Sequence, residues 1–188
     1  GWPERVVAMD PRGCGDSDEN KEKDYSPAMS ADDLLAFCDA LGLHNFDIVV
    51  NGSGINTVLT ALLKRPNLIR RLVLNDASPE FDGVGVARTT ALGRRIAEPR
   101  SWDEAIAALK DLSGDEFPAY SSSDWKFLAS VKWVEIDGRL VRDCDPALLD
   151  QTEGRDFHNR QAVYWTEFAL LNATKVLLVR GENSSYVT

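Results

Sequence analysis

The sequence is poor in the residues that build metal sites and disulfide frameworks. Its 188 residues include only three cysteines and two histidines. Cys14, Cys38 and Cys144 are widely separated and form no Cys-x-x-Cys pair, so we expect reduced, buried thiols in a reducing compartment. The carboxylates have no histidine nearby, and we therefore expect no metal ion and no cofactor.

Basic residues are the minority among the charged ones. Lys and Arg number 21 against 30 Asp and Glu, which gives a formal net charge of -9. A nucleic-acid surface needs a basic face and anionic membranes attract basic segments, so neither partner is expected. No apolar run approaches the roughly 20 residues of a membrane-spanning helix, and no signal peptide is recognised. We expect a soluble, cytoplasmic protein that binds a small molecule, in an oligomeric state that the sequence does not indicate.

Four short apolar segments rich in β-branched residues indicate buried parallel strands. Segments with helical spacing separate them, the first opening at Ser30 and stopping at Gly42, the second ending before Pro66. Strand alternating with helix predicts an α/β fold with a parallel sheet wound with helices, and ligands bind beyond the carboxyl ends of such strands. The expected strands are residues 5–9, 46–50, 71–74 and 175–179.

The stretch between the third and fourth strands is far longer than one crossover helix requires. It contains four of the five tryptophans, and an insertion at the ligand-binding edge is most simply a lid. The turn Asp137-Gly138 interrupts it. The expected helices are residues 86–96, 101–112, 123–134 and 161–171.

The chain starts and stops close to predicted core strands. Natural termini usually trail over the surface, so we expect a longer protein of which both ends are missing here.

Several motifs resemble those of the α/β-hydrolase superfamily. Residues 10–18, DPRGCGDSD, are similar to its D-x-R-G-x-G-x-S-D stretch, and residues 25–79 follow its order of helix, strand, serine turn, helix and strand. SWDEAIAAL in the insertion resembles a helical cap, and VLLVRGENS the strand that delivers the acid of the triad. The resemblance implies an incomplete core over residues 1–79 and 172–188 and a cap over residues 80–171.

The family's nucleophile motif, G-x-S-x-G, places a serine on a sharp strand-to-helix turn with small residues at both ends. This sequence allows two registers. With Ser53 as the nucleophile, the motif closes at Ile55, which is bulky. With the register moved by one residue, Gly54 closes the motif and Gly52 takes the nucleophile position. The helix length up to Pro66 favours this second register.

The resemblance implies partners for a serine nucleophile, which needs an oriented histidine and an oxyanion hole. The acid would be Glu182, after the last strand, or Asp76, after the third, although a structural role in the turn is an alternative for Asp76. The backbone N–H of Gly54 would supply half of the oxyanion hole. The other half comes from an HG loop before residues 5–9 in the family, which this sequence lacks.

Neither histidine fits the role of the base. His44 precedes the second strand, at the edge opposite the site, and is interpreted as a surface residue. His158 follows the lid loop, whereas the family's histidine follows a further strand beyond the last one here.

The other motifs are interpreted structurally. No helix starts directly behind Gly13-Cys14-Gly15, which argues against a dinucleotide-binding turn. Asp10 and Arg12 are expected to brace their loop. The tryptophans Trp125, Trp133 and Trp165 are expected in the core of the lid, or alternatively as a substrate wall.

Three functional hypotheses remain. The intact parent hydrolyses an ester or amide-type bond of a small, partly apolar molecule through an acyl-serine. Alternatively, the protein is a non-catalytic relative that binds a small molecule under its lid, or an isolated structural fragment. For the chain as given, which lacks a catalytic histidine and the HG loop, we expect no appreciable hydrolysis.

Overall fold

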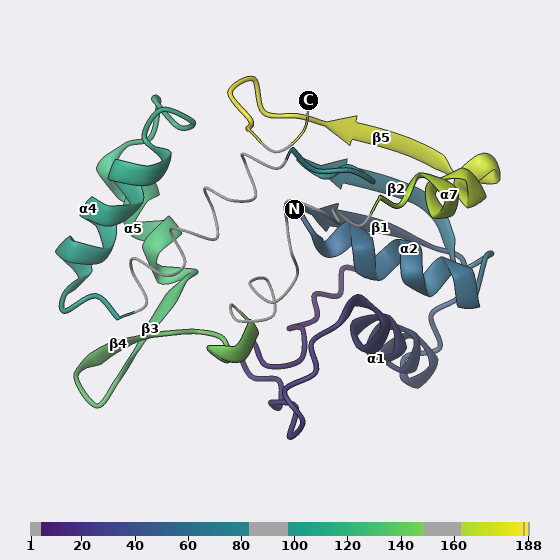
Figure 1. Cartoon of the computed structure of the whole chain (residues 1–188), viewed down its shortest axis with the longest axis horizontal. Helices are drawn as coiled ribbons and strands as arrows, with labels where there is room; N and C mark the ends of the chain where they lie inside the picture. Colours follow the sequence, from purple (N-terminus) through teal and green to yellow (C-terminus); the bar gives the residue numbers. More distant parts are fainter. Residues whose placement is uncertain (1–4, 83–97, 149–162, 186, 188) are drawn as a thin grey trace.

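A three-stranded parallel sheet forms one half of the molecule. The computed structural model of the chain describes residues 5–82, 98–148, 163–185 and 187. In the order β1-β2-β5 (Figure 1), the strands are β1 (Phe46–Asn51), β2 (Ile69–Asn75) and β5 (Lys175–Val179). These strands confirm the predicted α/β class and three of the four predicted strands.

Two helices cover one face of this sheet. They are α1 (Pro27–Ala40) and α2 (Gly54–Lys64), which lie side by side in Figure 1. The apolar face of α2 is fully buried, and Leu72 and Leu74 of β2 pack against it. Helix α1 begins earlier than the predicted Ser30, because Ser26 accepts a hydrogen bond from the Met29 N–H at 3.3 Å and Pro27 suits the first turn. The buried apolar residues of α1, α2 and the sheet pack together with Leu171, and we call this set the core cluster.

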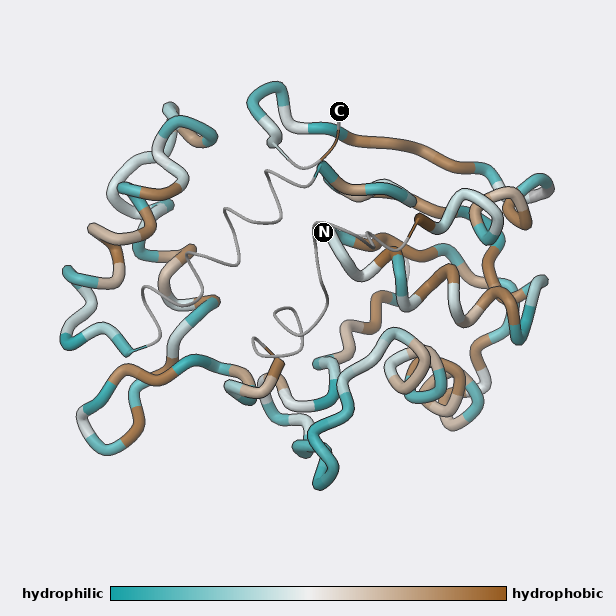
Figure 2. The backbone as a smooth tube through the Cα atoms, viewed as in Figure 1, coloured by the Kyte–Doolittle hydropathy of each residue, from teal (hydrophilic) through white to brown (hydrophobic). Residues whose placement is uncertain are grey.

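Among the residues that the structure describes, no helix covers the opposite face of the sheet. The register aligns Val49 of β1 with Val73 of β2 and Leu177 of β5. Val49 is 61% exposed and Leu177 57% exposed, and all five residues of β5 are exposed. Figure 2 shows β5 as a continuous hydrophobic segment. The prediction of buried strands is therefore wrong for β5. No helix of the described chain covers the face of Leu177, and on the other face Val176 and Leu178 of this edge strand are exposed as well.

Residues 5–9 do not form the fourth predicted strand. They have no strand assignment, and Val6 and Val7 are exposed. Their composition favours a strand, but a strand also needs a hydrogen-bonded neighbour, and the described part of the chain pairs β1 with β2 alone.

The other half of the molecule has its own apolar cluster. Helices α4 (Trp102–Ser113) and α5 (Ser122–Ser130) pack against a hairpin of β3 (Trp133–Ile136) and β4 (Arg139–Arg142). As expected, a helix follows Ser101, whose side chain caps α4 through the Glu104 N–H at 3.2 Å. We call this set, which is built on Ala105, Leu109, Trp125, Ala129, Trp133 and Leu140, the cap cluster.

The predicted helix over residues 123–134 ends early and becomes a strand. Asp137 and Gly138 have φ values of +51° and +74°, as a two-residue hairpin turn requires, and Val134 and Ile136 before it favour a strand. The Asp-Gly turn thus outweighs the helical spacing.

Residues 163–171, assigned to the cap from the sequence, pack on the core cluster instead. The predicted helix over 161–171 is a short α7 (Trp165–Phe168) followed by a 3-10 helix, η1 (Ala169–Ala173). Tyr164, Phe168 and Leu171 contact the core cluster. The predicted helix over 86–96 lies outside the described residues. Within the described chain, no helix has the length and apolar character needed to cross a membrane.

Candidate functional site

The carboxyl ends of the three parallel strands meet at one edge of the sheet. In the register of the sheet, Asn51 of β1 pairs with Asn75 of β2, and Asn75 with Val179 of β5. The Asn75 Nδ2 donates to Asn51 Oδ1 at 2.9 Å. Three predicted site residues follow these strand ends by one to three positions, so the structure brings their turns together: Ser53, Asp76 and Glu182.

The turn from β1 into α2 consists of Gly52 and Ser53. Gly52 has φ +49°, a left-handed conformation that costs a residue with a side chain about 1 kcal/mol or more. Its N–H donates to the Asn75 carbonyl at 3.2 Å. Gly54 then begins α2, and a Cβ at this position would lie 2.9 Å from Val50 Cγ2. Only glycine fits there without a shift of its neighbour.

This geometry matches the second of the two registers in the sequence. The left-handed residue at the corner is Gly52, and the close approach joins Val50 and Gly54, two positions to either side of it. Ile55, which closes the motif in the other register, is fully buried in the core cluster.

Ser53 lies one residue beyond the corner, in a right-handed conformation with φ -64° and ψ -10°. It is exposed and makes no capping hydrogen bond to α2. The first N–H groups of a helix have no intrahelical acceptor, and Gly54 stands at this position. The roles of Ser53 as nucleophile and of Gly54 in an oxyanion hole stay predictions.

Hydrogen bonds of Asp76 link the turn after β2 to the loop after β5. Its Oδ2 accepts a hydrogen bond from Ser184 Oγ at 2.7 Å, and its Oδ1 one from the Gly181 N–H at 3.4 Å. Its own N–H donates to the Val179 carbonyl at 2.8 Å. These bonds agree with the structural role weighed for Asp76. Glu182 is exposed in the same loop, and neither residue is tested as a catalytic acid.

Only one of the two histidines lies among the described residues. His44 is exposed in the turn before β1, at the opposite edge of the sheet, as the sequence indicates. His158 lies outside the described residues.

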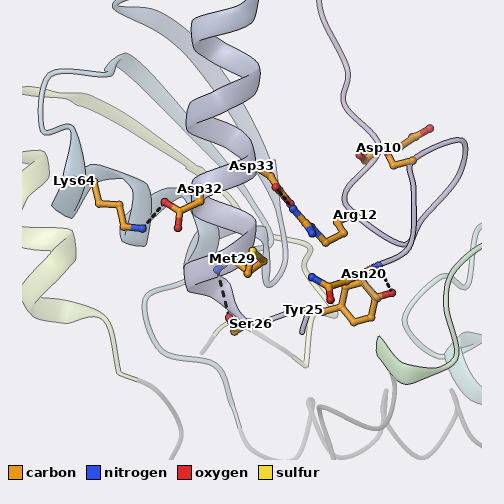
Figure 3. A network of polar contacts seen from close by, with 10 residues as sticks. Asp10, Arg12, Asn20, Tyr25, Ser26, Met29, Asp32, Asp33 and Lys64 are labelled. Atoms are coloured by element: carbon orange, nitrogen blue, oxygen red, sulfur yellow. Dashed lines mark hydrogen bonds and ion pairs between the residues drawn. The ribbon is translucent and has the colours of Figure 1, made fainter. Parts of the chain in front are cut away.

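The loop at residues 10–18 is braced in the predicted way. Arg12 forms a two-bond ion pair with Asp33 of α1, with Nε 2.7 Å from Oδ2 (Figure 3). Asp10 accepts from the Asp16 N–H at 3.2 Å, and Ser17 Oγ donates to the Asp10 carbonyl at 2.8 Å. Asp10 and Arg12 therefore brace this loop and fix it to α1.

The three predicted tryptophans occupy two different places. Trp125 and Trp133 are 5% and 1% exposed and fill the cap cluster, where Arg142 stacks on the Trp133 ring. Trp165 is 52% exposed on α7, and its Nε1 donates to Glu80 at 2.9 Å. A substrate contact of any of them stays a prediction. No group of three metal-ligating side chains occurs among the residues described.

The sequence did not reveal a polar contact between the segment that precedes α1, residues 10–26, and the segment that follows β4. We call residues 10–26 the first loop. Asp145 is 5% exposed. Its Oδ2 accepts from Lys23 Nζ at 2.7 Å and from the Tyr25 hydroxyl, while Oδ1 accepts from the Ala147 N–H at 3.0 Å. The hydrogen bonds from Lys23 and then Tyr25 lower the pKa of Asp145 to about 2. No spacing signals this contact, because its partners are more than a hundred positions apart.

The same contact brings two cysteines together. Cys14 and Cys144 are paired as an isolated antiparallel bridge and are half-buried, whereas Cys38 is buried inside the core. All three are free thiols, and the expectation of full burial holds for Cys38 alone.

Comparison with known proteins agrees with this architecture. The family model described as alpha/beta hydrolase fold matches residues 4–120. The chain is 27% identical over 184 residues to 2-(acetamidomethylene)succinate hydrolase of Mesorhizobium japonicum, covering 97% of this chain and 63% of the relative. It is 37% identical over 70 residues to 2-hydroxymuconate semialdehyde hydrolase of Pseudomonas putida, covering 37% of this chain and 25% of the relative.

A solved structure gives the same result. The crystal structure of an α/β hydrolase from Novosphingobium aromaticivorans superimposes with a TM-score of 0.78 at 28% identity, covering 95% of this chain and 64% of that one. The chain thus spans less than two thirds of the length of these relatives. With its parallel sheet, its strand-to-helix elbow and this family match over more than half its length, the chain belongs to the α/β-hydrolase fold family.

Proposed function

We propose that this chain is a member of the α/β-hydrolase family that binds a small, partly apolar carbonyl compound bearing a carboxylate, and that it does so without forming an acyl-serine. The observation that carries the proposal is the left-handed Gly52 at the corner of the elbow. A hydroxyl on this corner is what a serine hydrolase uses for attack, and glycine has none.

The chemistry of the ligand is inferred from the elbow and the relatives. The N-terminus of α2 offers backbone N–H groups and the positive end of the helix dipole, which favour a carbonyl oxygen or a carboxylate. Both named relatives act on compounds of this kind, 2-(acetamidomethylene)succinate and 2-hydroxymuconate semialdehyde.

A binding experiment tests this proposal. The protein is heated with a panel of N-acyl amino acids, unsaturated dicarboxylic acids and their esters, at concentrations of about ten times the dissociation constant. A member of the panel should raise Tm by about 2–5 °C, and chromatography should find no product. A panel that leaves Tm unchanged would contradict the binding proposal.

A second candidate function is hydrolysis of an ester or amide-type bond by the intact protein, with Ser53 as nucleophile. The exposure of Ser53 one residue beyond the corner favours it, and Asp76 or Glu182 would be the acid and Gly54 the oxyanion donor. A fluorophosphonate probe on the product of the full reading frame separates the two candidates. Labelling that disappears in Ser53→Ala would establish this second function, and absence of labelling supports the first.

Gly52→Ser is the informative companion variant. It places a hydroxyl at the corner, where the space around a new Cβ is open. If the first proposal is right, the fluorophosphonate probe should label Gly52→Ser and should label neither the original protein nor Ser53→Ala.

A further inference from the structure

Two short segments that are about 130 positions apart in the sequence, residues 13–15 and 143–145, run antiparallel beside each other. The Gly15 N–H donates to the Asp143 carbonyl at 3.1 Å, and the Asp145 N–H donates to the Gly13 carbonyl at 2.6 Å. These two bonds flank the bridge between Cys14 and Cys144. The cysteines are therefore a non-hydrogen-bonded antiparallel pair, in which the Cα atoms are about 4.5 Å apart and the side chains lie close. Disulfides span Cα separations of about 4.4–6.8 Å.

The two thiols are also chemically unequal. The hydrogen bond from the Cys14 thiol, aided by the positive charge of Arg142, lowers the pKa of Cys144 to about 6. The same hydrogen bond and burial raise the pKa of Cys14. A thiolate at one member of a facing pair is the arrangement that thiol–disulfide exchange requires.

We propose that Cys14 and Cys144 form a reversible disulfide that ties the first loop to the segment following β4. The oxidant is a low-molecular-weight disulfide such as oxidised glutathione. The Cys144 thiolate attacks one sulfur of glutathione disulfide, which releases one glutathione thiolate and leaves a mixed disulfide on Cys144. Cys14 then loses its proton and attacks the Cys144 sulfur, which forms the intrachain bond and releases the second glutathione. Two protein thiols are oxidised and one glutathione disulfide is reduced to two thiols.

The position of this bond gives it a consequence for the cap. In the described chain, the segment after β4 is held to the first loop by the two backbone hydrogen bonds above and by Asp145 with its partners Lys23 and Tyr25. Another polar contact joins Glu116, which accepts from Ser185 Oγ at 2.6 Å. These contacts are polar and exchange with water, whereas a disulfide is covalent. Oxidation therefore fixes the cap beside the first loop, and reduction returns it to the polar contacts. This inference is independent of the proposed function.

The test is oxidation of the folded protein with glutathione disulfide, followed by intact mass and peptide mapping. We expect a monomer that has lost two hydrogens and a linked peptide pair containing Cys14 and Cys144. Cys38→Ser should form the same bond, while Cys14→Ser and Cys144→Ser should stop at the mixed disulfide or stay reduced. A bond to Cys38, a disulfide-linked dimer as the main product, or no intrachain bond would overturn the proposal.

A second measurement guards against a bond formed only in unfolded chains. The oxidised protein should melt about 5–15 °C higher than the reduced protein, since the bond closes a loop of more than a hundred residues. In the reduced protein, brief treatment with iodoacetamide at pH 7 should modify Cys144 before Cys14 and Cys38. An unchanged Tm on oxidation, or equal alkylation of all three thiols, would count against a site built into the fold.

Discussion

At the corner between β1 and α2, neighbouring residues meet different conformational demands. Gly52 takes the left-handed backbone, Ser53 returns to the right-handed region, and Gly54 passes Val50 at a distance that no Cβ tolerates. The demands on Gly52 and Gly54 can each be tested by substitution with alanine, which adds one methyl group.

We expect Gly54→Ala to lower the free energy of unfolding by about 1–3 kcal/mol, because the new Cβ would meet Val50 Cγ2 at 2.9 Å. Urea denaturation followed by circular dichroism measures it. In the double variant Gly54→Ala/Val50→Ala, the loss should be smaller than the sum of the two single losses. Additive losses would show that the two residues do not touch.

Gly52→Ala, which has open space around its Cβ, should cost only about 1 kcal/mol, from its positive φ.

Asp145 makes the stability of the molecule depend on pH. Its pKa of about 2 in the folded state lies below the ordinary value of 3.8. A carboxylate with a lowered folded-state pKa stabilises the fold above its unfolded pKa, and the stabilisation is lost as pH falls from about 4 to about 2. We expect Asp145→Asn to lose about 1–3 kcal/mol at pH 7 and to show a weaker decline over this pH window.

Asp143→Asn is the matched control for that variant, since the Asp143 side chain has no hydrogen bond or ion pair among the residues described. Thermal melts between pH 2 and pH 7 compare the two. A steep decline retained in Asp145→Asn would assign the pH dependence to other groups.

Sequence reasoning at the residue scale succeeds where partners are local. Neighbours in the chain or in the next helix are enough to predict three features: the bracing of the loop by Asp10 and Arg12, the surface position of His44 and the two elbow registers. The Asp145 and Cys144 contacts could not be predicted, because nothing in the spacing of residues specifies which loop a distant segment will reach.

At the scale of elements, helix caps and turns decide the boundaries. The helix after Ser101 was predictable from its cap and spacing. The helix over 123–134 was predicted too long, because its apolar spacing continues into residues that pair as β3 and bury Trp133. The Asp137-Gly138 turn was visible in the sequence, and its positive φ values make it a hairpin turn.

Helix α5 is short and depends on its capping box, in which the Ser121 side chain accepts from the Asp124 N–H and the Asp124 carboxylate accepts from the Ser121 N–H. Ser121→Ala should reduce the stability of the cap cluster by about 1 kcal/mol. Fluorescence of the buried Trp125 and Trp133 during urea unfolding reports it. Ser122→Ala, one residue later and exposed, should change the midpoint little. Equal effects of both variants would contradict a capping role for Ser121.

At the scale of the whole molecule, the main feature is the sheet face that no described helix covers. The row Val49, Val73 and Leu177 crosses all three strands without a covering helix in the described chain. Contiguous apolar surface of this kind favours association. The sequence predicted the strands but not this face, because a parallel sheet normally has helices on both sides.

We expect this chain to bind anilinonaphthalene sulfonate and to associate as its concentration rises. Leu177→Lys should reduce the dye fluorescence and shift the sedimentation profile toward the monomer. Leu63→Lys is the control, since Leu63 is 54% exposed on α2, away from the row. A chain that stays monomeric, or equal effects of both substitutions, would contradict an adhesive role of this sheet face.

The pairing of residues 13–15 with residues 143–145 also has a consequence during translation. Residues 13–15 leave the ribosome about 130 positions ahead of residues 143–145, which at about 5–20 residues per second is a delay of roughly 6–26 s. During that interval the first loop has no partner for residues 13–15, so it reaches its final conformation only after residues 143–145, which follow the cap cluster, have been synthesised.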